Sequence, residues 1–327
     1  MDENPMLRIP ITDIGPVRIG QVENAAAGTG CTALVCEGGM RAGVDIRGGG
    51  PASRETPLLN PLMAAQTVHA IVLSGGSAFG LDAAGGVMRC LEERGIGFDV
   101  GVTKVPLVAQ SDIFDLTVGD PAVRPDAAMG YEAARRALDA PNYRDGNYGV
   151  GCGATVGKIA GMDRCMKTGV GSFAVQIGPL RIGAIVALNA LGDVFDWKTG
   201  RQVAGLLSAD KTALRSTSAY MRGAIEAVEN RFVANTTLGV VMTNAAFDKS
   251  RLCKIAGMAQ DGYARAIHPV HTGADGDSIY ALSLGDVPAD QDLVGTLAAE
   301  VVGEAILRAV EAADSAYGHP CAADLRA

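Results

Sequence analysis

Short apolar runs bounded by glycine-rich turns mark the first half of the chain, and they predict strands. The runs at 31–36, 41–47 and 69–73 each have the length of a buried strand. The third run leads into the glycine-rich segment 74–80. The next segment, 81–94, has helical periodicity, so a strand is expected to pass through a tight turn into a helix.

The second half of the chain mixes predicted strands and helices. Two neighbouring apolar segments, 169–178 and 180–189, are expected to pair as strands. Further strands are expected at 237–243 and 278–284, and helices at 127–140, 249–267 and 291–313. Because some strands follow one another without a helix between them, the pattern favours an α+β layered fold with substantial antiparallel sheet over a doubly wound sheet.

Composition and charge narrow the class of protein. The chain has 327 residues, of which 48% are hydrophobic and 20% charged, so it can bury a large core as one large domain or two ordinary ones. The formal net charge is -8, and no block of Lys and Arg stands out. This argues against nucleic acid and anionic membranes as main partners.

Cysteine and histidine usage gives no sign of a metal site. The seven cysteines form no CxxC pair and there are only four histidines, which disfavours zinc. Residues 1–8 lack the apolar run of a signal peptide, and no stretch of about 20 apolar residues is present to span a membrane. We therefore expect a cytoplasmic protein with reduced thiols and no cofactor.

A candidate nucleophile lies at the start of the predicted strand 237–243, in the tripeptide Asn235-Thr236-Thr237. A threonine hydroxyl is a weak nucleophile unless a base lies beside it, and a threonine that begins a chain can use its own α-amine as the base. An internal threonine is exposed when its hydroxyl attacks the preceding carbonyl, the acyl group shifts to oxygen and water releases the ester. The same tripeptide also fits an ordinary turn into a strand.

Two carboxylates flank a glycine in the segment 271–277, as Asp275-Gly276-Asp277. Across a tight turn, such carboxylates can orient an ammonium or amine base, or raise each other's pKa. A solvated loop is the alternative. A calcium loop is disfavoured because the further ligands of an EF-hand are absent.

Lys158 closes the glycine-rich segment 153–158. The spacing is not that of a phosphate-binding loop, because Ile159 follows the lysine. A lysine between glycine and apolar residues can be buried, with a lowered pKa, and can equally be exposed.

A second glycine-rich segment, 74–80, lies between a predicted strand and a predicted helix. The backbone N–H groups of Gly75, Gly76 and Ser77 could bind an anion or an oxyanion there. A bare glycine-rich turn is the alternative. Asn189, at the end of an apolar strand, could donate its amide to the same oxyanion.

Together these segments resemble the DmpA-type aminopeptidase family, which includes β-peptidyl aminopeptidases and the nylon-oligomer hydrolase. The resemblance rests on four segments that occur in the family's order and cover most of the chain, namely 75–80, 153–158, 235–244 and 271–277. It implies an αββα sandwich in a single domain, 1–327. It also implies self-cleavage into 1–235 and 236–327, and a homotetramer of the processed units.

The resemblance also implies roles for particular residues. Thr236 is the implied nucleophile and Thr237 the competing candidate. Similarity to the nylon-oligomer hydrolase points to four catalytic neighbours, Lys158, Asn189, Asp275 and Asp277. The aminopeptidases of the family carry serine and glutamate in place of the two aspartates, and a pocket tyrosine near Phe114, where this chain shows no clear tyrosine.

The sequence thus predicts a self-processing N-terminal-threonine amidohydrolase that works through an acyl-enzyme. Small peptides, amino-acid amides, β-peptides and ω-amino-acid oligomers are all candidate substrates. An acyltransferase resembling the ornithine acetyltransferases is the alternative, because water and an amine compete for the same acyl-enzyme. A non-catalytic binding protein is a third reading, which predicts an uncleaved chain.

Overall fold

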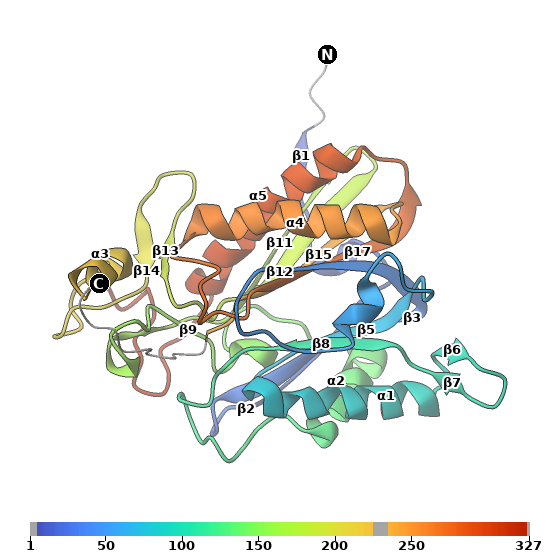
Figure 1. Ribbon diagram of the computed structural model, residues 1–327, viewed down its shortest axis with the longest axis horizontal. Coiled ribbons are helices and arrows are strands. Elements are labelled where there is room, and N and C mark those ends of the chain that lie inside the picture. Colours follow the sequence, from blue (N-terminus) through green and yellow to red (C-terminus); the bar gives the residue numbers. More distant parts are fainter. Residues whose placement is uncertain (1–4, 225–234, 326–327) are drawn as a thin grey trace.

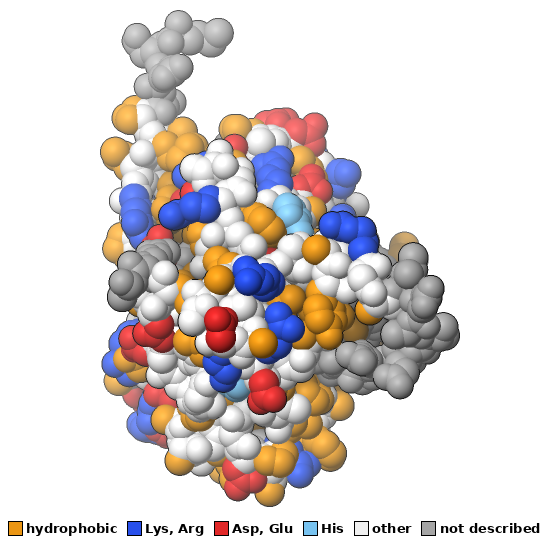
Figure 2. All heavy atoms as spheres, turned by 90° about the vertical axis from the view of Figure 1, so that its left-hand side faces the viewer, with side chains coloured by type: hydrophobic (Ala, Val, Ile, Leu, Met, Phe, Trp, Pro, Cys, Tyr) orange, Lys and Arg blue, Asp and Glu red, His pale blue; other side chains and the backbone are white. Residues whose placement is uncertain are grey.

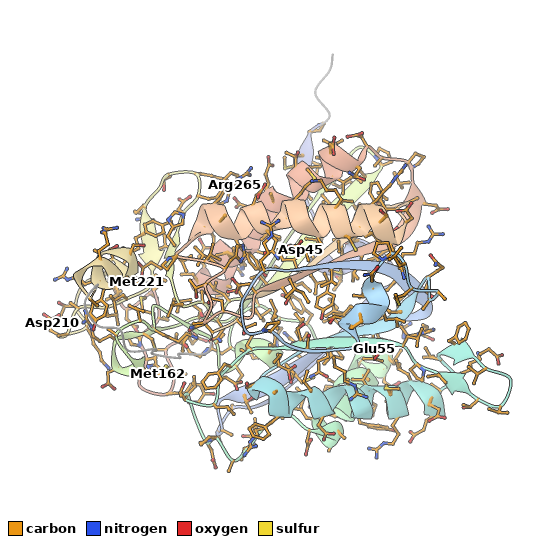
Figure 3. The ribbon with its side chains drawn as sticks, viewed as in Figure 1. Asp45, Glu55, Met162, Asp210, Met221 and Arg265 are labelled. Atoms are coloured by element: carbon orange, nitrogen blue, oxygen red, sulfur yellow. The ribbon has the colours of Figure 1, made fainter. Side chains whose placement is uncertain are left out.

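The computed structural model describes residues 5–224 and 235–325 and arranges them in four layers (Figure 1). Two β-sheets face each other, and a pair of helices covers the outer side of each sheet (Figure 1). The side chains drawn in Figure 3 fill the space between these layers. The expected αββα sandwich is therefore confirmed.

The first sheet carries the segments that later form the site. In spatial order it contains β1, β11, β12, β15, β17 and the second part of β3. β15 and β17 are parallel, and the other neighbours are antiparallel. The bounds are β1 Met6–Arg8, β11 Val170–Ile177, β12 Leu180–Ala187, β15 Leu238–Ala245, β17 Ser278–Val287 and β3 Thr29–Ile46.

The second sheet begins with β2 and contains the first part of β3, followed by β5, β8 and β4. Here β5 and β8 form the parallel pair. The bounds are β2 Arg18–Asn24, β5 Val68–Ser74, β8 Val108–Asp112 and β4 Ala52–Arg54. β3 therefore belongs to both sheets and ties them together.

Strand β3 corrects the sequence prediction, which placed two strands at 31–36 and 41–47. The structure has one strand, whose pairing with β5 shifts register between Val35 and Met40. Gly39, with φ of 77°, lies within this irregular stretch and takes a conformation that other residues adopt only with strain. The bulge lets the chain pass from one sheet to the other without ending the strand.

Four long helices form the outer layers. α4 (Lys249–Ala266) and α5 (Gln291–Glu311) pack on the first sheet, and α1 (Ala83–Glu93) and α2 (Ala127–Asp139) pack on the second. Each of α2, α4 and α5 begins after an aspartate whose carboxylate accepts backbone N–H groups of the first turn. All four helices were predicted, with bounds that agree to within three residues.

Three hydrophobic clusters separate the four layers. Successive residues of β15 point to opposite faces, so Val240 joins the cluster between the sheets and Val241 joins the cluster under α4 and α5. Ile279 and Tyr280 of β17 divide in the same way. This double burial explains why 237–243 is a continuous apolar run instead of an alternating one.

Shorter elements connect these layers. They are β6 Phe98–Asp99, β7 Lys104–Val105, β9 Thr155–Val156, β10 Met166–Lys167, β13 Asp193–Phe195, β14 Gln202–Ala204, β16 Ile267–His268, α3 Thr217–Gly223 and the 3-10 turns η1 Ile11–Asp13, η2 Thr56–Leu59, η3 Ser77–Asp82, η4 Gly149–Gly151 and η5 Met162–Arg164. Figure 2 shows one face of the molecule, on which acidic and basic side chains are interspersed. None of the helices in the described ranges combines the length and apolarity needed to span a bilayer.

Candidate active site

Parallel pairing of β15 and β17 brings two of the predicted segments together. Leu238 at the start of β15 lies opposite Ser278 at the start of β17. Because the strands run the same way, the residues that precede them meet at one edge of the sheet. Asn235 accordingly forms a parallel bridge with Asp275.

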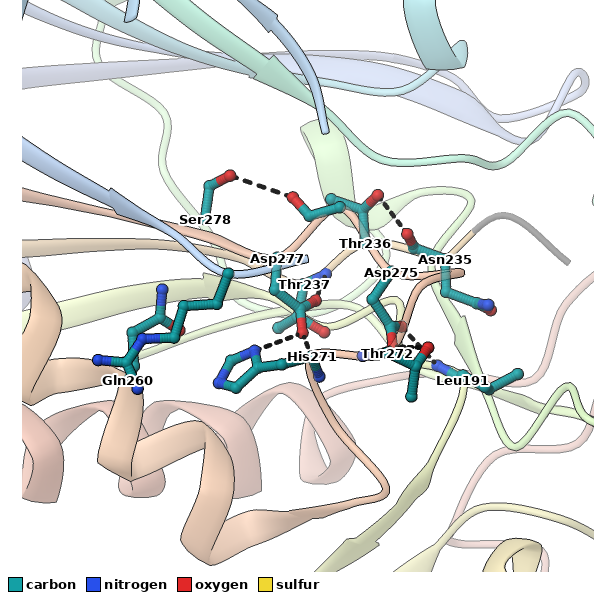
Figure 4. Close-up of polar contacts among 12 residues, drawn as sticks. Leu191, Asn235, Thr236, Thr237, Gln260, His271, Thr272, Asp275, Asp277 and Ser278 are labelled. Atoms are coloured by element: carbon teal, nitrogen blue, oxygen red, sulfur yellow. Dashed lines mark hydrogen bonds and ion pairs between the residues drawn. The ribbon is translucent and has the colours of Figure 1, made fainter. Parts of the chain in front are cut away.

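The hydroxyl of Thr236 lies beside the Asn235–Thr236 peptide group. Thr236 Oγ1 donates a hydrogen bond to the carbonyl oxygen of Asn235 at 2.5 Å, as Figure 4 shows. The same carbonyl oxygen accepts the backbone N–H of Gly276 at 2.8 Å. On the other side of the bond, the N–H of Thr236 donates to the main-chain oxygen of Asn189 at 2.9 Å. Both halves of the Asn235–Thr236 peptide group are therefore held in place beside the hydroxyl.

Asp277 anchors the backbone next to the nucleophile. Its Oδ1 accepts the N–H of Thr237 at 2.8 Å. Its Oδ2 accepts two groups of His271, the backbone N–H at 3.1 Å and ring Nδ1 at 2.9 Å (Figure 4). The carboxylate thus ties the loop before β17 to the start of β15. Thr237, the competing candidate, is fixed through its backbone, and its buried hydroxyl has no hydrogen-bond partner among the described residues.

Asp275 is built into the same loop. Its Oδ2 accepts the N–H and hydroxyl of Thr272 at 2.9 and 2.5 Å, and its Oδ1 accepts the N–H of Leu191 at 3.4 Å. Burial, followed by repulsion from Asp277, raises the pKa of Asp275 above its ordinary value. The carboxyl therefore fixes the loop that faces Asn189.

Lys158 is buried beside Asn189. Its Nζ donates to the side-chain oxygen of Asn189 at 2.7 Å and to its main-chain oxygen at 3.2 Å. The second of these oxygens is the one that accepts Thr236 N–H, so the lysine and the nitrogen of Thr236 share an acceptor. Burial lowers the pKa of Lys158 to about 8, although nearby acidic groups oppose the shift. A large neutral fraction near pH 8 makes this amine a suitable base.

Asn189 follows β12, which runs antiparallel to β15 and so ends where β15 begins. Its Nδ2 donates to the main-chain oxygen of Phe114 at 3.0 Å, and its Oδ1 also accepts the N–H of Thr155 at 3.1 Å. The region of Phe114 therefore contacts the site through a backbone carbonyl. Asn189 is held by several segments that are distant in the sequence.

The loop 75–77 differs from its expected role, because its backbone donors already have acceptors. Gly75 N–H donates to Gly30 at 2.9 Å, Gly76 N–H to Asp115 Oδ1 at 2.7 Å, and Ser77 N–H to Ile113 at 3.0 Å. An oxyanion could bind there only if these hydrogen bonds were exchanged. In this conformation the carbonyl oxygen of Asn235 accepts a backbone N–H from Gly276.

Sequence reasoning missed Asp115 and Gly276. Asp115 is buried under the glycine loop, accepts Thr29 Oγ1 at 2.7 Å, and has its pKa raised to about 6 by burial. The charge of Lys158 works against this shift. An aspartate within the otherwise apolar segment 113–116 was the available signal. Gly276 acts through its backbone, which leaves no mark on residue type.

Other candidate chemistry was also sought. In residues 5–224 and 235–325, no group of three or more His, Cys, Asp or Glu side chains is placed to hold a metal ion. All seven cysteines are free thiols.

Comparison with known proteins decides the family. The sequence profile of peptidase family S58 matches residues 10–321. The chain belongs to peptidase family S58. The DmpA-type resemblance is thereby confirmed, together with the expected hydrolysis of amide bonds.

Family S58 relatives cover nearly the whole chain. An uncharacterised aminopeptidase of Mycobacterium leprae is 40% identical over 95% of this chain and 92% of its own length. A 6-aminohexanoate-oligomer endohydrolase of Agromyces is 31% identical over 91% of this chain and 84% of its own length.

Solved structures show the same fold. The l-aminopeptidase d-Ala-esterase/amidase of Ochrobactrum anthropi, described as a variant of the Ntn-hydrolase fold, matches with a TM-score of 0.68 and 19% identity over 93% of this chain and 86% of its own. A Burkholderia β-aminopeptidase matches with a TM-score of 0.64 and 20% identity over 94% and 88%. The S58 chain described here therefore has the Ntn-hydrolase fold.

Proposed function

We propose that this S58 chain cleaves itself between Asn235 and Thr236 and then uses Thr236 as an N-terminal nucleophile to hydrolyse small peptides or linear amides. The observation that carries the proposal is the position of the Thr236 hydroxyl, 2.5 Å from the carbonyl oxygen of the residue before it. A buried lysine, a fixed asparagine and two carboxylates surround the same peptide bond, which supports the proposal.

The contacts around this bond support the following route for self-cleavage. Neutral Lys158 takes the hydroxyl proton as Thr236 Oγ1 bonds to the carbonyl carbon of Asn235, and the N–H of Gly276 stabilises the negative oxygen. The carbon–nitrogen bond then breaks, and Lys158 returns the proton to the nitrogen of Thr236. Water hydrolyses the resulting ester and leaves a carboxylate on Asn235 and a free α-amine on Thr236.

Turnover uses the α-amine that self-cleavage releases. The carbonyl oxygen of Asn189 holds this amine at the position where it now holds the amide N–H. The amine takes the hydroxyl proton as Thr236 attacks the substrate and gives it to the departing amine. Lys158, when charged, keeps the α-amine neutral by repulsion. Asp275 and Asp277 position the backbone on both sides of the nucleophile, and Asn189 orients the base.

The relatives support hydrolysis over acyl transfer. They are an aminopeptidase and an oligomer endohydrolase, and both activities release an acyl group to water. We therefore do not favour the acyltransferase alternative. A homotetramer of processed units and a cytoplasmic location stay predictions.

Trapping the acyl-enzyme tests this proposal. The processed protein would be mixed with an aminoacyl p-nitrophenyl ester, quenched in acid and digested. We expect the acyl mass on the peptide that begins with Thr236, and none after Thr236→Ala. An acyl group found on another residue, or equal ester turnover by Thr236→Ala, would refute the assignment.

A further inference from the structure

Asn235 is bound like one residue of an added β-strand. Its N–H donates to the carbonyl oxygen of Ala274 at 2.9 Å, and its carbonyl oxygen accepts the N–H of Gly276 at 2.8 Å. These two hydrogen bonds flank Asp275 and make the parallel bridge between Asp275 and Asn235. The backbone of 274–276 thus binds the N–H and the carbonyl group of Asn235, which are separated by a single carbon atom.

We propose that this backbone edge, Ala274 O and Gly276 N–H, is the binding site for the acyl residue of the substrate and selects α-aminoacyl groups. The inference rests on the proposed function. It assigns a substrate class that the site chemistry around Thr236 leaves open. The recognition mode is the addition of an extended segment to an exposed backbone edge.

Self-cleavage and turnover each form an ester on the same oxygen, Thr236 Oγ1. Self-cleavage passes through an ester in which the acyl group of Asn235 is bonded to Thr236 Oγ1. Turnover passes through an ester in which the substrate's acyl group is bonded to the same oxygen, after its amide bond has broken and the amine has left with a proton. The position of Asn235 therefore marks where an acyl group lies when it is attached to the nucleophile.

The edge keeps its position without Asn235, because it is paired on its other side. Gly50 N–H donates to Asp275 O at 2.9 Å, and Gly49 N–H donates to Thr272 O at 3.2 Å. A Cβ on Gly48 would lie 2.3 Å from Asp275 O, so this close pairing requires a glycine. A rigid edge is thus available as soon as Asn235 departs.

Departure of Asn235 leaves two backbone groups that need partners. Gly276 is buried, and a buried backbone N–H without an acceptor is costly. An α-aminoacyl group supplies both partners, because its amino nitrogen and its carbonyl have the spacing found in Asn235. A β-aminoacyl or 6-aminohexanoyl group has additional methylenes between them and cannot meet both groups in the same extended geometry.

A set of anilides with one leaving group tests the inference on the processed wild-type enzyme. The acyl groups are alanyl, β-alanyl, 6-aminohexanoyl, lactyl and propionyl, each as the p-nitroanilide. The lactyl and propionyl pair isolates the donor, because both are uncharged and only lactyl can donate to Ala274 O. We expect kcat/KM for lactyl to exceed that for propionyl about 3- to 10-fold, the usual effect of one hydrogen bond. We expect alanyl to exceed β-alanyl and 6-aminohexanoyl by about 10-fold or more.

The outcomes separate this inference from the proposed function. Equal values for lactyl and propionyl, or β-alanyl or 6-aminohexanoyl at least as fast as alanyl, would overturn the inference while Thr236-dependent turnover upholds the function. If none of the anilides is cleaved and no acyl group forms on Thr236, both fail. A crystal structure of the alanyl-enzyme should show the acyl nitrogen within hydrogen-bond distance of Ala274 O, and a nitrogen directed elsewhere would also overturn the inference.

Discussion

Gly276 lies so close to Thr236 that the hydroxyl of Thr236 occupies the space that a side chain at position 276 would need. A Cβ on Gly276 would be 2.6 Å from Thr236 Oγ1 and 2.9 Å from Gly50 O. The first distance is shorter than any normal contact, so either the hydroxyl or the loop would have to move. The glycine between the two aspartates therefore serves the placement of the nucleophile as well as the turn.

This contact predicts the effect of Gly276→Ala. Displacing the hydroxyl by a fraction of an ångström to 1 Å should slow self-cleavage about 100-fold. The rate would be followed as loss of intact chain on denaturing gels. Gly273→Ala is the matched control, because a Cβ there meets nothing within 4 Å. Equal slowing in both variants, or none in Gly276→Ala, would show that the contact does not position Thr236.

Two buried lysines with pKa values of about 8 should respond oppositely to replacement by methionine. Lys158→Met removes a charge that is costly to bury. The substitution leaves neither oxygen of Asn189 without a donor, because the N–H groups of Thr236 and Thr155 still donate to them. Lys167 donates to the main-chain oxygens of Gly151, Ala154 and Thr168. The first two keep the backbone N–H groups of Ala154 and Thr168 as donors, whereas the buried oxygen of Thr168 loses the donor that Lys167 supplies.

We expect Lys158→Met to raise the free energy of unfolding at pH 7 by about 1 to 3 kcal/mol while slowing self-cleavage at least about 100-fold. Lys167→Met should lower the free energy of unfolding by about 1 to 3 kcal/mol. Because the pKa of Lys158 is lowered in the folded state, burying its charge destabilises the fold fully below pH 8 and progressively less as the pH rises towards 10.5. The stability gained by Lys158→Met should therefore decrease between pH 8 and pH 10.5. Because the wild type is expected to cleave itself, denaturant titration compares both variants with their parent in a Thr236→Ala background, where every chain stays uncut. A destabilised Lys158→Met would contradict the account.

The pH dependence of self-cleavage should report Lys158. If its neutral amine is the base, the first-order rate constant rises about tenfold per pH unit below pH 8 and levels off above it. Stopped samples taken between pH 6 and pH 9.5 would give the profile. A rate that is constant across this range would exclude Lys158 as the base.

Asp277→Asn should impair the alignment of the site. Asp277 accepts one N–H from Thr237 and two from His271, whereas asparagine offers one oxygen and directs an amide donor at the remaining N–H groups. We expect slower self-cleavage, by about tenfold or more, and a loss of about 1 to 3 kcal/mol of stability. Asp261→Asn, at an exposed position on α4, is the control. Unchanged processing in Asp277→Asn would remove Asp277 from the site.

The strands and helices could be predicted from sequence because periodicity marks them directly, whereas the αββα arrangement of the layers came from the family resemblance. The continuous apolar run in β15 and the helical stripes of α4 and α5 reflect burial, which residue type records. β3 was split in the prediction because Gly38 and Gly39 mark a turn, whereas the chain makes a bulge and continues. Pairing between distant strands leaves no such mark, so convergence of the site segments came from the family resemblance.

Main-chain groups explain what sequence reasoning missed in the site. Lys158, Asn189 and the two aspartates were predicted as neighbours of Thr236 through the family resemblance, and the structure brings them around the Asn235–Thr236 bond. The N–H of Gly276 and the three carbonyl oxygens that bind Lys167 are backbone groups. Because every residue carries such groups, residue types do not reveal these contacts. The expected donors of Gly75 and Gly76 are occupied because a buried carboxyl, Asp115, and Gly30 accept them.

Intact mass under denaturing conditions tests the central claim most directly. The chain has a mass of 33.5 kDa, and dividing it between 235 and 92 residues gives pieces of about 24 and about 9.5 kDa. We predict both pieces for the wild type and for Thr237→Val, with residue 236 first in the smaller piece. Thr237→Val replaces a hydroxyl that has no hydrogen-bond partner within residues 5–224 and 235–325. Thr236→Ala should stay at the full mass. Cleavage in Thr236→Ala, or an uncleaved wild type after prolonged incubation, would contradict the account.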